Sequence, residues 1–133
     1  MKKLILLVIL IFSIPFIGNT NNFQQGQGGK VKDIDVETFS TLIDSRPGNI
    51  LDVRTPNEWE GGIIEGAIQI NFYDDNFIVK ATQLNKNKVI YIYCKAGGRS
   101  SKAAKQLKEK GYRIFNLLGG FDTWKEAKKP ISK

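Results

Sequence analysis

The stretch KVIYIYCKAGGRSSKAAKQLKEKG, residues 88–111, contains the only cysteine of the chain, Cys94. It begins with residues 89–93, which are all apolar or aromatic, as in a central strand that is buried on both faces of a parallel sheet. After two glycines, apolar residues recur at helical spacing behind Ser100 or Ser101, either of which is suited to be the N-cap. The stretch therefore predicts a strand, a tight loop and a helix, with Cys94 at the carboxyl end of the strand.

On either side of this stretch the chain alternates between strand and helix patterns. Further strands are predicted at residues 30–35, 50–53, 67–72 and 112–118, and further helices at 36–45, just after Thr55, within 74–84 and within 119–127. Asp35 is the predicted N-cap of the first helix, and Thr55 forms a predicted capping box with Glu58. This alternation predicts one α/β domain, with a mostly parallel five-stranded sheet flanked by helices on both faces. Open parallel sheets bind ligands at the carboxyl ends of their strands, where Cys94 is expected.

Composition excludes several kinds of chemistry. The chain has 133 residues, which suits one domain, and no histidine, so a Cys-His or Ser-His pair and histidine metal sites are impossible. A single cysteine forms neither an intrachain disulfide nor a cysteine-rich zinc site. The net charge of +7 favours anionic small molecules or acidic surfaces in general. The lysines are scattered, with no basic block, and we therefore predict no nucleic-acid partner.

The N-terminal residues have the composition of a targeting segment. Two lysines precede the apolar residues 4–12, a stretch shorter than the roughly 18–20 residues that span a bilayer. We predict a signal peptide or an uncleaved anchor at residues 1–20, a flexible Asn-, Gln- and Gly-rich linker at 21–30, and the folded domain at 31–129. The expected location is outside the cytoplasm, in the periplasm, with membrane contact only through this segment if it stays uncleaved.

The loop after the central strand has the features that activate a thiol without histidine. Gly97 and Gly98 allow backbone angles that turn several N–H groups inward, and the helix start adds partial positive charge. Arg99 adds a full charge, and Lys95 adds another at the rim. A thiol with a pKa of about 8.5 is only a few per cent ionised at neutral pH, and lowering its pKa by about two units makes most of it thiolate. The loop therefore predicts a nucleophilic Cys94.

Four stretches resemble, in order and spacing, the signatures of the rhodanese-like sulfurtransferase domain. They are ILDVRTPNEWEGGIIEGAIQIN (residues 50–71), VIYIYCKAGGRS (89–100), SSKAAKQLKEKGY (100–112) and LLGGFDTWK (117–125). The resemblance extends over nearly all of residues 31–127. Because several separated signatures agree, it is much more specific than the cysteine loop alone.

The resemblance implies that Cys94 accepts a sulfane sulfur from a small anionic donor such as thiosulfate, or from a persulfide. Cys94 would then pass the sulfur to a thiol, a protein acceptor or cyanide, without a metal or an organic cofactor. The residues that would hold the sulfur or the donor's oxygens are those of the loop: Lys95, Ala96, Gly97, Gly98, Arg99 and Ser100. Arg99 would also brace this loop. Asp52 and Arg54 are expected to give structural support by tying the second strand to neighbouring loops.

The chain departs from the family pattern just after its predicted second helix. Where the family usually has His-Ile, and then Pro before Gly-Ala, this chain has Gly62, Ile63 and Glu65. We expect this difference to affect the rigidity of the local loop more than the sulfur chemistry.

Two other functions fit parts of the pattern. A Cys-dependent phosphatase also uses a cysteine and an arginine in one loop, but it places five residues between them to surround a tetrahedral phosphate. Here only residues 95–98 separate Cys94 from Arg99, and the smaller ring fits a sulfur atom better. A non-catalytic or sulfur-carrier module that serves a protein partner would have the same fold. Formation of a persulfide on Cys94 would separate an active carrier from an inert module.

Overall fold

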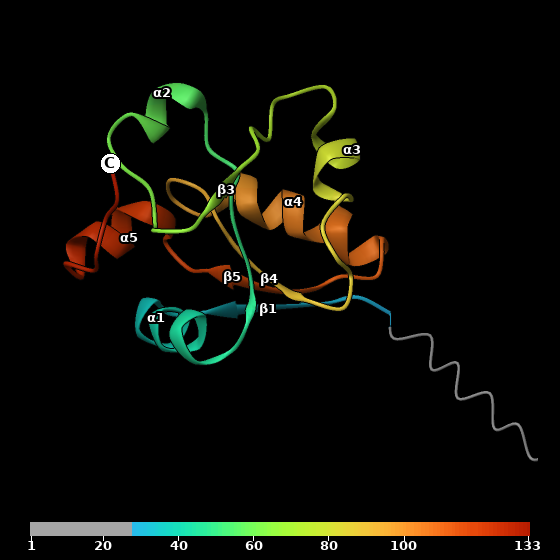
Figure 1. The fold of residues 1–133 in the computed structure, drawn as a ribbon, viewed down its shortest axis with the longest axis horizontal. Helices are drawn as coiled ribbons and strands as arrows, with labels where there is room; N and C mark the ends of the chain where they lie inside the picture. The colour runs from blue at the N-terminus through green and yellow to red at the C-terminus, as the bar shows by residue number, and fades with distance from the viewer. Residues whose placement is uncertain (1–27) are drawn as a thin grey trace, which may run out of the picture.

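The computed structural model describes residues 28–133, so the predicted signal or anchor segment and most of the predicted linker lie outside the described residues. A five-stranded sheet forms the centre of the domain, in the order β1-β5-β4-β2-β3 (Figure 1). Its strands are β1 (Lys30–Ile34), β2 (Gly48–Asp52), β3 (Ile68–Gln69), β4 (Val89–Tyr93) and β5 (Arg113–Leu117). All neighbouring strands pair in parallel, which confirms the predicted α/β class.

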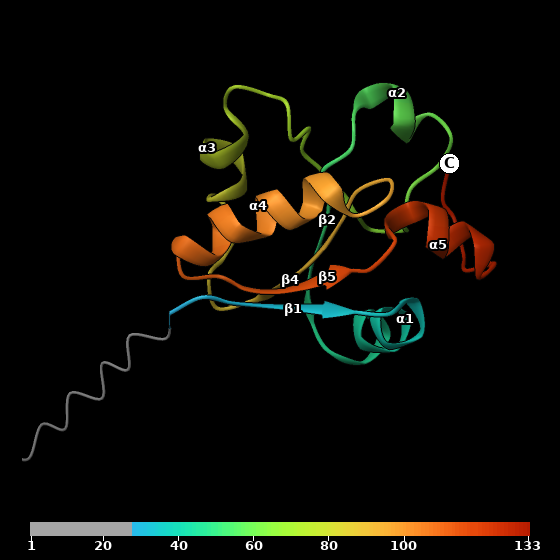
Figure 2. The ribbon, with the colours of Figure 1, turned by 180° about the vertical axis from the view of Figure 1, so that it is seen from behind.

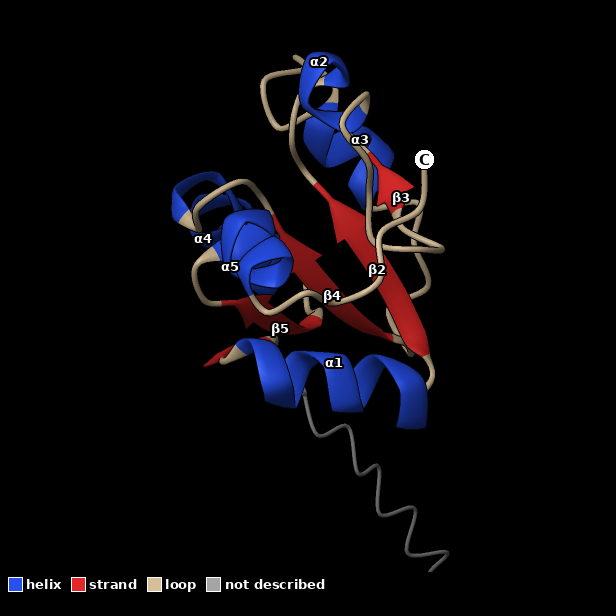
Figure 3. Ribbon diagram, turned by 90° about the vertical axis from the view of Figure 1, so that its left-hand side faces the viewer, coloured by secondary structure: helices blue, strands red, loops and turns tan. Residues whose placement is uncertain are grey.

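Helices cover both faces of this sheet (Figures 2 and 3). They are α1 (Val36–Ser45), α2 (Pro56–Trp59), α3 (Phe77–Ala81), α4 (Gly98–Glu109) and α5 (Gly120–Glu126). α1 and α5 share one buried cluster with Tyr91 and Tyr93, whereas α3 and α4 share the other with Ile90 and Ile92. Alternate side chains of β4 thus enter opposite layers, and all of them are buried. Within residues 28–133, no helix has the length and apolar character needed to cross a membrane.

Local capping explains where the first two helices begin. The Asp35 carboxylate accepts a hydrogen bond from the Thr38 N–H at 2.8 Å, which confirms the predicted N-cap of α1. At α2 the Glu58 carboxylate accepts hydrogen bonds from the N–H and the hydroxyl of Thr55, at 3.1 and 3.0 Å. This is the predicted capping box, and it fixes Glu58 at the carboxyl end of the sheet.

Two predicted boundaries differ most from the structure, and β2 also begins two residues before its predicted start, at Gly48. The strand predicted at residues 67–72 is regular only at Ile68–Gln69, because the chain then turns away and keeps single hydrogen bonds from the N–H groups of Ile70 and Phe72 to the end of β2. The helix predicted to be capped by Ser100 or Ser101 already begins at Gly98. Its N-cap is Gly97, whose left-handed backbone (φ of 113°) lets the helix start directly behind the cysteine.

The C-terminal residues pack back onto the domain. Ile63 and Ser132 exchange two backbone hydrogen bonds, at 2.9 and 2.8 Å. The Trp124 indole N–H donates to the Pro130 carbonyl at 2.9 Å. The chain beyond residue 129, the predicted end of the domain, is therefore held against the loop that follows α2.

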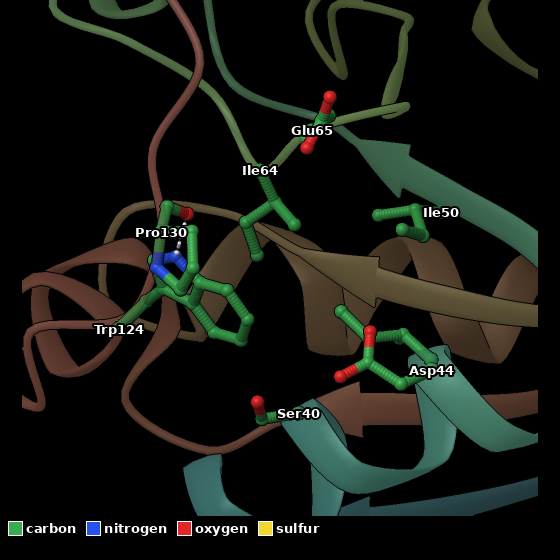
Figure 4. A pocket seen from close by; sticks show the side chains of 8 residues that line it. Ser40, Asp44, Ile50, Ile64, Glu65, Trp124 and Pro130 are labelled. Carbon is green, nitrogen blue, oxygen red and sulfur yellow. Dashed lines mark hydrogen bonds between the residues drawn. The ribbon is translucent and has the colours of Figure 1, made fainter.

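This packing leaves a cavity of about 200 Å³ on the α1 face of the sheet (Figure 4). Ile50, Ile64 and Trp124 contribute apolar walls, and Asp44 and Glu65 also line it. Cys94 belongs to the buried cluster on the other face, so this cavity is not part of the site around the thiol.

Candidate active site

Cys94 follows directly after β4, the middle strand of the sheet, and is 1% exposed. The chain then turns through residues 95–97 and enters α4, as predicted. The Gly97 N–H donates a hydrogen bond to the Cys94 Sγ at 3.0 Å. A buried thiol therefore faces the beginning of a helix, where unpaired N–H groups and the helix dipole favour a negative charge.

Opposing effects act on the pKa of the Cys94 thiol. Burial raises this pKa, but hydrogen bonds from the side chain and N–H of Ser100, and from the N–H groups of Gly97 and Ala96, outweigh burial and lower it. The Ser100 hydroxyl also lies 3.2 Å from the Gly97 carbonyl oxygen. A thiolate competes well for that single proton, because hydrogen bonds to charged acceptors are stronger. The site therefore favours the nucleophilic form of Cys94 without an imidazole.

The start of α5 holds the loop from the other side. The N–H groups of Phe121 and Asp122 donate to the carbonyls of Cys94 and Lys95, at 2.8 and 3.0 Å. This approach needs a glycine at position 120, because a Cβ there would lie 2.5 Å from the Cys94 carbonyl oxygen. This role of Gly120 has no local signal in the sequence, although the Gly-Gly pair belongs to the C-terminal family signature.

Arg99 forms a two-pronged ion pair with Glu58, with N–O distances of 2.6 and 2.8 Å. Together with the hydrogen bonds from Thr55, this pair lowers the pKa of Glu58 to about 2. The guanidinium carbon of Arg99 also lies 5.7 Å from the centre of the Tyr73 ring. Arg99 thus links the cysteine loop to α2. Sequence reasoning identified Glu58 only as a capping residue, since nothing local indicates a partner 41 positions away.

Asp52 and Arg54 form a second, fully buried ion pair beside the site. The Arg54 Nε and Nη2 atoms donate to the Asp52 carboxylate at 3.0 and 2.8 Å, and Nη2 also donates to the Gly62 carbonyl at 2.7 Å. The Arg54 guanidinium carbon lies 4.0 Å from the centre of the Phe121 ring. The pair therefore connects the end of β2 to the loop after α2 and to the start of α5.

The remaining loop residues form the exposed rim of the site. Lys95 reaches across to Asp122, with 2.7 Å between its Nζ and the carboxylate. Ala96 and Gly98 are exposed. Tyr73 is 66% exposed and lies beside Arg99, so an aromatic ring and a lysine border the approach to Cys94.

The sequence pattern of the rhodanese-like domain matches residues 35–127, which are most of the chain. The chain belongs to this family. Solved structures agree: a rhodanese-related protein from Thermoplasma volcanium superposes with a TM-score of 0.69 at 28% identity, covering 76% of this chain and 97% of that one.

Two relatives indicate the general class of activity. A sulfurtransferase from Allochromatium vinosum is 34% identical over 103 residues, covering 76% of this chain and 94% of that protein. A putative sulfur carrier protein, YrkF from Bacillus subtilis, is 32% identical over 111 residues, covering 82% of this chain and 59% of that protein. These similarities support sulfur transfer in general.

Proposed function

We propose that this protein is a sulfurtransferase that carries sulfane sulfur as a persulfide on Cys94. The observation that carries the proposal is the buried thiol at the end of β4, with the Gly97 N–H at 3.0 Å from its sulfur and with a lowered pKa. A thiolate held in this way is a nucleophile, and the N–H groups around it suit an anionic sulfur.

Thiosulfate is the proposed small-molecule donor. The Cys94 thiolate attacks the outer sulfur of thiosulfate, a sulfur–sulfur bond forms on Cys94, and sulfite leaves with the electron pair of the broken bond. The same N–H groups that stabilise the thiolate then stabilise the terminal sulfur of the persulfide. No redox partner is needed, because both electrons of the broken bond leave with sulfite.

In the second step an acceptor thiolate or cyanide attacks the terminal sulfur and releases the Cys94 thiolate. The rim favours anionic molecules through Lys95, although its partner Asp122 reduces that attraction. Arg99 is paired with Glu58, so its proposed part is to hold the loop rather than to carry free charge into the site.

A carrier that delivers sulfur only to a protein partner is the second candidate, and the similarity to a putative sulfur carrier protein favours it. Both candidates require a persulfide on Cys94 and differ in the acceptor. A phosphatase is less compatible, because only residues 95–98 lie between cysteine and arginine.

The test is the intact mass of the purified protein before and after thiosulfate, and again after cyanide. The expected result is the gain of one sulfur atom, its loss to cyanide, and no change in the Cys94→Ser variant. Sulfur gained but not released to cyanide or small thiols would favour the protein-partner carrier. No gain from thiosulfate or from a small-molecule persulfide would contradict both candidates.

The proposed place of action is outside the cytoplasm, based on the composition of residues 1–20. A lone reactive thiol in an oxidising compartment forms mixed disulfides, so an exported thiol partner would keep Cys94 available. Fractionation of cells that make the full chain tests this: a soluble cytoplasmic pool that retains Met1 would contradict export.

A further inference from the structure

The amino end of the sheet, opposite Cys94, carries a group of four cations. This basic patch consists of Lys30, Lys32, Arg46 and Arg113. They surround a cavity of about 280 Å³, which is also lined by Val89, Ile114 and Phe115. The lining residues come from the first three residues of β1, β4 and β5 and from Arg46, which follows α1. The patch is therefore formed where strands begin, whereas the active site is formed where they end.

Within residues 28–133, no cation of the basic patch lies within 4.0 Å of a carboxylate, although six such ion pairs occur elsewhere. Lys30 and Arg113 are directly opposite each other in the register of β1 and β5. Like charges placed opposite each other destabilise a sheet. A group of cations with this internal repulsion and no internal counter-charge favours an external anion.

The floor of the patch is apolar. The Arg46 guanidinium carbon lies 5.8 Å from the centre of the half-buried Phe115 ring, which stacks on Tyr91. Val89, on the same face of the sheet as Phe115, completes the floor. A cationic rim above an apolar floor matches a surface that presents anionic groups next to hydrocarbon, as a phospholipid bilayer does.

We propose that the basic patch docks on the surface of a bilayer that contains anionic phospholipids. The patch includes Lys30, the first residue of β1, and the chain before it carries the apolar residues 4–12. Only residues 13–29 separate the two features in the sequence, so the proposal has both act on the same membrane. The basic patch would thus be a second membrane contact, in addition to the N-terminal segment expected from the sequence.

The proposed orientation leaves the active site in water. Val89 begins β4 and Cys94 directly follows its end, so these two residues are roughly 16 Å apart at about 3.3 Å per residue. A bilayer under the patch would therefore face the side of the domain opposite the cysteine loop. Donors and acceptors could still reach Cys94.

The test measures how the full chain partitions onto vesicles of phosphatidylcholine alone and of phosphatidylcholine with one-third phosphatidylglycerol. The ratio of the two partition coefficients isolates the charge-dependent contribution, since the apolar N-terminal segment is common to both. Each basic side chain near an anionic surface changes partitioning by about fivefold. The triple variant Lys30→Gln, Lys32→Gln, Arg46→Gln should therefore lower the ratio by roughly a hundredfold.

The matched control is Lys102→Gln, Lys128→Gln, Lys133→Gln, which removes the same net charge from exposed positions outside the patch. It should keep the wild-type ratio within about threefold, and both variants should unfold at the wild-type temperature. Equal losses in the two variants, or no preference of the wild type for anionic vesicles, would overturn the proposal. The proposal would also be overturned if the triple variant kept the wild-type preference for anionic vesicles but lost binding to a single-stranded RNA oligomer. The patch would then be a nucleic-acid site.

Discussion

The two ends of the sheet use positive charge in opposite ways. At the carboxyl end Arg54, Lys95 and Arg99 each pair with a carboxylate at 2.6–2.8 Å. At the amino end the basic patch has no paired cation among the residues that the structure describes. Paired cations fix the positions of loops, whereas unpaired cations create a field that acts on whatever lies outside. We therefore expect sulfur transfer at the carboxyl end to depend on single contacts. We expect membrane binding at the amino end to depend on the summed charge of the basic patch.

The largest effect should come from Cys94→Ser. This change should abolish sulfur transfer from thiosulfate to cyanide, because no other residue of the chain has a thiol. The preference for anionic vesicles should stay at the wild-type value, since the basic patch lies at the other end of the sheet. The measurements are the rate of thiocyanate formation and the vesicle ratio. Retention of a tenth of the wild-type rate would refute the carrier role of Cys94.

Two crowded glycines, one at each end, allow a direct comparison. A Cβ at Gly120 would lie 2.5 Å from the Cys94 carbonyl oxygen, and a Cβ at Gly48 would lie 2.6 Å from the Val89 carbonyl oxygen. Substitution by alanine at either site should lower the free energy of unfolding by about 2 kcal/mol, because the new Cβ would clash with the backbone. Gly120→Ala should cost more than Gly48→Ala, since Gly120 also has a φ of 58°. Urea unfolding measures this.

At temperatures well below the melting temperature, where both variants are folded, only Gly120→Ala should also slow sulfur transfer. Only that clash displaces the cysteine loop. Gly48→Ala, although less stable than wild type, should transfer sulfur at the wild-type rate. If both variants lost activity in proportion to stability, the carboxyl end would have no special dependence on the position of α5.

A smaller loss is expected for Arg99→Ala. Removing the two bonds to Glu58 frees the loop from α2, and we expect sulfur transfer to fall by more than tenfold, about 1.4 kcal/mol in transition-state stabilisation. Arg99→Lys should recover little, because a lysine keeps the charge but not the two-pronged geometry. Glu58→Gln and Arg99→Ala should be non-additive in a double-mutant cycle. Full activity of Arg99→Lys would show that charge, not bracing, is what Arg99 supplies.

Sequence reasoning succeeded where the signal is local or periodic. The buried pattern of residues 89–93 predicted the central strand, and Asp35 and Thr55 predicted two helix starts. It placed Cys94 at the carboxyl end of the sheet, because the strand and helix periodicities leave one place for the loop. The start of α4 was misplaced, since a serine cap is the commoner signal and a left-handed glycine N-cap is not recognised by spacing alone.

The contacts that hold the site were not accessible from sequence. Glu58 and Arg99 are far apart in the chain, and their pairing depends on β2 lying next to β4. The role of Gly120 depends in the same way on α5 approaching the cysteine loop. The basic patch collects residues from β1, β5 and the end of α1, so in the sequence its members looked like scattered lysines and arginines.

The smallest effect concerns one hydrogen bond to the thiol. Ser100 contributes to lowering the pKa of Cys94, so Ser100→Ala should raise that pKa. The thiolate is lost as pH falls through the pKa, and the acid limb of the variant should therefore lie at higher pH than that of the wild type. Loss of one hydrogen bond corresponds to about threefold slower alkylation by iodoacetamide at neutral pH. The two rates should converge at alkaline pH, where both thiols are ionised.

Ser101→Ala is the matched control for this last change. Ser101 also lies in the first turn of α4, but its hydroxyl oxygen accepts from the Asn116 side chain at 3.3 Å instead of contacting the thiol. Its alkylation profile should follow the wild type. An equal shift in both variants would mean that the first turn of α4 as a whole, rather than the Ser100 hydroxyl, sets the pKa of Cys94. Activation of the thiol would then depend on the backbone N–H groups of the loop and not on its side chains.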